Sequence, residues 1–288
     1  GYMEDLTEAA LNTARQRGAD FADVRIVERR ENTVRVRRRS VKHITDEETR
    51  GYAVRVLKDG AWGLASDTVL ERDRLSQAAE TAVRIADASA RVPSEKPAKM
   101  VSEPAHRETC VAPSREDPFE IPAAEKADLL LSACSTMMDV DEIAMAWGEL
   151  QFIRLRRIIA NTDGTYLDLT NLFTAPSLEA TAVTGGDSQS RGYQGGARQA
   201  GYEFIREIDL PGNAERWAQE AVTKTEADEC PRGVMDLVLD PDHLALTMHE
   251  SVGHPTESDR VLGWEANMAG RSFVSPSDVG SLQYAARR

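Results

Sequence analysis

The chain has 288 residues, enough for two domains with cores, and its 41% hydrophobic and 29% charged residues are typical of a soluble globular protein. The net charge of −13 argues against general nucleic-acid affinity, and no apolar run approaches the roughly 20 residues that cross a bilayer. Cys110, Cys134 and Cys230 form neither a disulfide framework nor a C-x-x-C metal pair, so we expect reduced thiols and a cytoplasmic protein.

The first 92 residues predict a helix, an antiparallel meander of strands and a second helix. Apolar residues at helical spacing predict helices over 3–17 and about 68–88, the second capped by Ser66 or Asp67. Alternating apolar residues predict the strands between these helices, within 22–30, 32–38, 40–45, 50–58 and 62–65, with turns at Glu31-Asn32 and Asp59-Gly60. This is a compact α+β module, and we assign residues 1–92 to a first domain.

A basic cluster in this module invites a nucleic-acid interpretation. It consists of Arg35, Arg37, Arg38 and Arg39. Arg35 and Arg37 alternate with Val34 and Val36, as residues of a half-buried strand do when arginines occupy its wet face. We therefore favour a solvated strand face, or an edge protected by charge, over a nucleic-acid site.

Residues 93–122 contain six prolines and are predicted to be a linker to a second, β-rich domain over 123–288. Helices are expected over 123–138 and 212–228, the latter with Asn213 as a possible cap. The strands expected between these helices lie near 144–159, 164–174 and 177–184.

Six glycines lie within residues 185–201, a composition that also occurs in phosphate-binding loops. The segment has neither a G-K-[ST] sequence nor a G-x-G-x-x-G sequence between a strand and a helix. We therefore expect a mobile loop or an irregular hairpin between strands.

A short apolar strand over 234–239 and a well-marked helix follow in the second domain. Asp240 is placed to cap a helix that begins at Pro241. Leu244, Met248 and Val252 recur every fourth residue and predict an apolar stripe that packs against a core.

His249, Glu250 and His254 lie near the end of this helix. Two imidazoles and a carboxylate are a usual set for a metal ion that activates water. In H-E-x-x-H both histidines share one helical face, but here a regular helix separates them by roughly 140° and 7.5 Å of rise. A π-bulge would align them. Unwinding at Gly253 is the other route, and the Gly-His-Pro sequence favours it. A coincidental pair of histidines at a frayed helix end is the alternative to metal binding.

The residues around this motif resemble the TldD side of the TldD/PmbA family, zinc metallopeptidases once named modulators of DNA gyrase. The resemblance is carried by His249-Glu250-Ser251-Val252-Gly253-His254-Pro255-Thr256-Glu257-Ser258-Asp259-Arg260, Leu262-Gly263-Trp264-Glu265-Ala266 and Ala269-Gly270-Arg271-Ser272-Phe273. It implies one zinc ion per active site, held by His249 and His254, with Glu250 as general base. PmbA-like partners lack the histidine motif, so the chain is similar to the catalytic type of subunit.

The resemblance also implies a third zinc ligand, a cysteine from a carboxy-terminal β-rich region. No residue of this chain matches that cysteine, so we expect a fragment, a natural truncation or a substitute ligand. The nearby carboxylates are Glu257, Asp259 and Glu265. Glu257 and Asp259 are alternatively expected to orient the imidazoles, or Asp259 to cap a helix over 259–270.

We therefore predict an α+β protein whose β-rich second domain carries the metal-site helix. The family implies zinc-dependent hydrolysis of unfolded or modified peptides, by a homodimer or a heterodimer with a PmbA-like paralogue, without nucleic acid or membrane. The alternative is a non-catalytic peptide-binding or dimerisation subunit that lacks a complete metal site.

Overall fold

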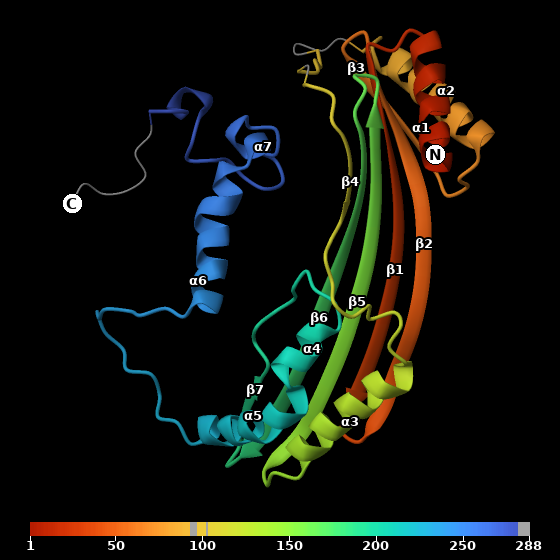
Figure 1. The fold of residues 1–288 in the computed structure, drawn as a ribbon. Coiled ribbons are helices and arrows are strands. Elements are labelled where there is room, and N and C mark those ends of the chain that lie inside the picture. The colour runs from red at the N-terminus through yellow and green to blue at the C-terminus, as the bar shows by residue number, and fades with distance from the viewer. Residues whose placement is uncertain (93–96, 102, 282–288) are drawn as a thin grey trace. The chain divides into compact units, whose positions relative to one another are not determined.

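The computed structural model describes residues 1–92, 97–101 and 103–281 of two compact units, Gly1–Ala227 and Asp228–Arg288. The larger unit is a helix–meander–helix module continued by further strands and helices, which confirms the predicted α+β class (Figure 1). The sheet formed by its described residues contains strands from both sides of the predicted linker. The predicted domain boundaries stay predictions.

The sheet of the larger unit has seven strands in the order β3-β2-β1-β5-β6-β4, with β7 also paired to β6. β4 runs parallel to β6, and the other neighbours are antiparallel. The strands are β1 (Phe21–Arg37), β2 (Ser40–Lys58), β3 (Ala61–Asp67), β4 (Arg107–Val111), β5 (Ile143–Asn161), β6 (Tyr166–Thr184) and β7 (Asp187–Gly192).

The helices of this unit pack on one face of the sheet, at its two ends (Figure 1). Val24 of β1 belongs to the core under α1 and α2, and Val34 belongs to the core under α3 and α5. Because side chains alternate between faces with a period of two, Val24 and Val34 point to the same face. The helices are α1 (Tyr2–Gln16), α2 (Arg72–Ser89), α3 (Ala123–Met138), α4 (Glu203–Ile208) and α5 (Leu210–Thr225).

The predicted turn at Glu31-Asn32 is wrong, because β1 continues without a break. Asn32 is buried, its Nδ2 donates to the carbonyl of Thr45 at 2.8 Å, and its Oδ1 accepts from Lys126 Nζ at 2.6 Å. These partners satisfy an amide that would otherwise favour a turn. The strands expected over 40–45 and 50–58 likewise form one strand, β2.

The strands expected over 164–174 and 177–184 also form a single strand, β6, despite Pro176. The amide of Thr174 donates to the carbonyl of Arg198. This hydrogen bond lies on the edge of β6 that faces away from β5. Pro176, two residues further on, therefore has its nitrogen on that same edge, between the stretches of β6 that pair with β4 and β7. A proline is compatible with a strand where no ladder bond needs its N–H.

The helices expected over 3–17 and 123–138 are confirmed as α1 and α3, but two predicted caps are wrong. The residue that precedes α2 is Glu71, because the Asp67 carboxylate accepts from the amides of Thr68 and Val69 in a turn before the helix. Asp209 caps α5 by accepting from the amide of Gly212, so the cap lies one turn before the expected cap Asn213.

The glycine-rich segment begins with a hairpin between β6 and β7. Gly185 and Gly186 form its turn with φ of +59° and +92°, a left-handed region that glycine enters without steric cost. The predicted linker also contributes structure, because β4 within it pairs with β6.

The arginine cluster lies on exposed surface and contacts neighbouring residues of the same unit. Arg35 Nη2 lies 2.6 Å from Glu149, and Arg39 Nη2 lies 2.6 Å from Asp139. Arg38 donates to the carbonyl of Ala144. These contacts agree with the solvated strand face favoured from the sequence.

The smaller unit contains α6 (Pro241–Met248), a π-helical turn at His249–Gly253, a 3-10 turn at His254–Thr256, α7 (Ser258–Val261) and a 3-10 turn at Pro276–Asp278. The strand predicted over 234–239 is wrong, because this segment is irregular and Val234 and Val238 are fully exposed. The helix expected over 259–270 stops early, and Gly263 then adopts φ +75°. In the part of the chain that the structure describes, no helix is long and apolar enough to cross a membrane.

Candidate metal centre

The helix that leads to the histidines begins as predicted. Asp240 caps α6 by accepting from the amide of Asp242 at 3.0 Å, and Pro241 occupies the first helical position. The predicted packing of its apolar stripe is not found within the smaller unit, where Leu244, Met248 and Val252 are 39%, 55% and 47% exposed. Regular apolar spacing predicts which side chains share a helical face, but it does not predict which part of the protein covers that face.

The two histidines are brought together by the π-helical turn. The amide of His254 donates to the carbonyl of His249, an i→i+5 bond that places one additional residue in the turn. The centroids of the two rings lie 4.3 Å apart, with an angle of 67° between the ring planes. Gly253 has φ −57° and ψ −63°, so the chain does not unwind there. The expectation of unwinding is therefore wrong, and the π-bulge is the route that this structure uses.

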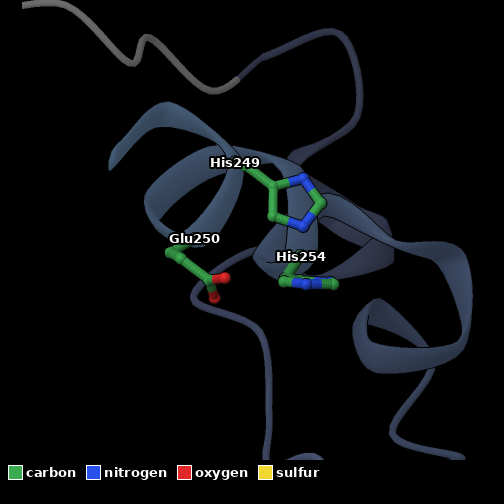
Figure 2. Close-up of side chains that lie close together, drawn as sticks. All are labelled: His249, Glu250 and His254. Carbon is green, nitrogen blue, oxygen red and sulfur yellow. The ribbon is translucent and has the colours of Figure 1, made fainter. Parts of the chain in front are cut away.

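The side chains of His249, Glu250 and His254 converge beside this turn (Figure 2). One potential ligand atom from each lies within 4.8 Å of the other two. Tetrahedral zinc with bonds of about 2.1 Å requires ligand atoms about 3.4 Å apart. His249 and Glu250 are exposed, which leaves their side chains room to rotate toward that spacing. The donor types and their placement therefore fit a zinc ion.

The nearby carboxylates differ in what they contact. Glu257 Oε1 lies 2.8 Å from His254 Nδ1, whereas Asp259 Oδ1 accepts from the backbone amide of Arg260. Neither carboxylate, nor that of Glu265, belongs to the candidate metal cluster found among the described residues. The third group in that cluster is Glu250.

Sequence reasoning missed two residues that support this turn. Thr256 Oγ1 donates to the carbonyl of Val252 at 2.8 Å, which closes the turn from its carboxy-terminal side. The hydroxyl of Ser272 donates to the carbonyl of Pro255. The first contact follows the i, i+4 spacing of a helix and was accessible from sequence. The second joins residues 17 positions apart and depends on the tertiary fold.

Two family models match the larger unit. Residues 22–86 match domain 1 of the PmbA/TldA metallopeptidases, and residues 116–228 match their central domain. Together these stretches cover more than half of the chain. The chain belongs to the PmbA/TldD metallopeptidase family.

Relatives with known names agree with this membership. The chain is 25% identical over 255 residues to a protein of Methanothermobacter thermautotrophicus named as a metalloprotease, with 88% of this chain and 54% of the relative covered. A metalloprotease of Methanocaldococcus jannaschii is 24% identical, with 84% and 53% covered. The chain therefore spans about half the length of these relatives.

Solved structures show the same fold. The chain is similar to a protein of Thermotoga maritima described as a proposed modulator of a DNA gyrase, with a TM-score of 0.59, 20% identity, and 80% of this chain and 50% of that chain covered. It is also similar to TldE of Thermococcus kodakarensis, with a TM-score of 0.52, 17% identity, and 77% and 47% covered.

Proposed function

We propose that this chain carries the zinc-binding helix of a cytoplasmic peptidase that hydrolyses unfolded or modified peptides. The observation that carries the proposal is the π-helical turn, which makes a separated pair of histidines adjacent and places Glu250 beside them. Membership of a metallopeptidase family supports the reaction class. The chain accounts for about half of its relatives' length, so the activity is proposed for the whole protein.

In this mechanism His249 and His254 would hold the ion through one ring nitrogen each. Zinc bound there supplies Lewis acidity, which polarises a peptide carbonyl and makes a nearby water more acidic. Glu250 accepts the proton of the attacking water and then transfers it to the leaving amine. The exposure of Glu250 leaves its carboxylate accessible to both water and peptide.

The position of Glu250 in the same cluster as the histidines also suits a zinc ligand. A catalytic zinc site usually has three protein ligands and one open position. If Glu250 is the base, the third ligand comes from outside this cluster. If Glu250 is the third ligand, another group must accept the proton.

The variant Glu250→Gln distinguishes these roles. We expect it to retain zinc, measured by elemental analysis of the purified chain, and to lose hydrolysis of a fluorogenic peptide. Loss of zinc would instead make Glu250 a ligand, and retained hydrolysis would reject its role as base. A His249→Ala variant serves as the control that removes one ligand.

The second candidate is a non-catalytic subunit that binds peptide or mediates dimerisation. It is favoured by the cluster itself, which brings together only two imidazoles and one carboxylate among the described residues. Zinc absent from the wild-type chain and from a chain extended to the length of its relatives would support this candidate. We also propose that the protein forms a homodimer or pairs with a PmbA-like paralogue, which light scattering of each sample would test.

A further inference from the structure

Glu257 follows the 3-10 turn that contains His254. Side chains three residues apart nearly eclipse each other on a 3-10 helix, so this spacing directs Glu257 toward the imidazole. Its Oε1 lies 2.8 Å from His254 Nδ1. This is a hydrogen-bonding distance, whereas the Glu250 oxygen of the metal cluster lies only within 4.8 Å of the histidine ligand atoms.

The contact determines which ring nitrogen of His254 is available to a metal ion. An ionised carboxylate can only accept, so Nδ1 must carry the proton and donate it to Glu257. A neutral imidazole has one protonated nitrogen, and the lone pair is then on Nε2. His254 is thereby prepared to bind zinc through Nε2.

Glu257 is itself restrained on two sides. Its other oxygen, Oε2, lies 3.2 Å from Arg260 Nε, an ion pair outside hydrogen-bond geometry. The side chain of Arg260 is only 20% exposed, which limits its freedom to leave. The carbonyl of Glu257 accepts from the amide of Val261, so the backbone at Glu257 is fixed by the first turn of α7. The carboxylate therefore approaches His254 from an anchored segment.

We infer that Glu257 is a positioning residue, which holds His254 in the Nδ1–H tautomer and in the orientation needed for zinc. The inference rests on the proposed metal site but concerns a residue outside the metal cluster. Asp259 is a matched comparison, because it carries the same charge two residues away and accepts a hydrogen bond from the amide of Arg260 rather than from an imidazole.

The first experiment measures zinc affinity of the full chain by competition with a chromogenic chelator. Removing an outer partner of a metal-bound histidine typically weakens affinity about 10–100-fold. We expect that loss for Glu257→Ala, a smaller loss for Glu257→Gln, whose amide oxygen can still accept, and less than about threefold for Asp259→Asn. A loss in Glu257→Ala no larger than that in Asp259→Asn would mean that the contact with His254 does not affect zinc binding, and would overturn the inference.

The second experiment needs no metal and therefore separates this inference from the proposed function. Long-range ¹H–¹⁵N spectra of metal-free, ¹⁵N-histidine-labelled chain at about pH 8.5, where free imidazole is neutral, report the tautomer of each ring. A His254→Gln variant identifies the His254 signals. We expect the Nδ1–H form in the wild type and in Asp259→Asn, and its loss in Glu257→Ala. An Nε2–H form in the wild type, or no change in Glu257→Ala, would overturn the inference even if zinc binds.

Discussion

Gly253 is the position at which the two routes for aligning the histidines make opposite predictions. Its backbone is right-handed, with φ −57° and ψ −63°, and an added Cβ would lie 3.6 Å from His249 Nδ1, an ordinary contact. Alanine is more favourable than glycine in a helix by about 0.8–1.0 kcal/mol. We therefore expect Gly253→Ala to stabilise the π-helical turn by up to about 1 kcal/mol.

That stabilisation has a measurable consequence for metal binding. Where metal binding requires the folded turn, a gain of about 1 kcal/mol tightens zinc affinity by up to about fivefold. If the metal-bound chain instead unwinds at Gly253 into a left-handed conformation, alanine costs about 1–2 kcal/mol and weakens affinity by about 5–30-fold. The sign of the change decides between the routes.

Two measurements on Gly253→Ala follow from this reasoning. The zinc titration should show equal or tighter binding, and the amide of His254, which donates to His249, should exchange more slowly with solvent in the metal-free chain. Gly263→Ala is the control for a glycine that is left-handed. Gly263 has φ +75°, and an added Cβ there would have no atom within 4 Å, so backbone strain is the cost of alanine at this position. Affinity at least fivefold weaker, or faster exchange at His254, would refute the π-helical route.

Two further predictions concern the larger unit. In Gly63→Ala the new Cβ would lie 1.9 Å from the carbonyl oxygen of Ala82, so α2 must move, and we expect urea unfolding to show a loss of about 1–3 kcal/mol or more. Gly51→Ala, whose nearest atom lies at 3.3 Å, should lose clearly less. Arg156 donates two hydrogen bonds to Asp168 and holds the pKa of that carboxyl below its usual range, so its stabilisation is present above about pH 4 and is lost as pH falls through the lowered pKa. Asp168→Asn should therefore show a shallower loss of stability below about pH 4 than the wild type, and an equal slope would contradict this assignment.

Local signals predicted most helices of the larger unit, because their apolar spacing repeats within a few residues, although the caps predicted for α2 and α5 were wrong. The lengths of the strands were not predictable in the same way. Asn32 is a turn residue by propensity, and only its partners Thr45 and Lys126, from other elements, make it compatible with the middle of β1. Pro176 similarly interrupts a strand unless its nitrogen lies on an unpaired stretch of edge. Both corrections depend on neighbours that are distant in sequence.

The candidate site was likewise only partly predictable from the sequence. The residue types of His249, Glu250 and His254 identify a metal chemistry, but their spacing does not fit a regular helix. The low helix propensity of glycine and proline on either side of His254 predicted that the helix unwinds at Gly253. In the structure Pro255 instead enters a 3-10 turn that follows directly on the π-helical turn. Since proline has no N–H to donate, the first turn of a new helix is a position that it tolerates.

The π-helical turn also explains why the additional residue between the histidines is compatible with one site. Insertion of one residue into a regular helix rotates everything after it by about 100°, which would carry His254 away from His249. An i→i+5 bond absorbs the insertion locally, so the residues on either side keep their relative placement. His254 then begins a 3-10 turn, and the tighter winding places Glu257 three residues later against its ring. The π-helical turn thus brings the histidines together, and the 3-10 turn that follows it positions Glu257 to orient one of them.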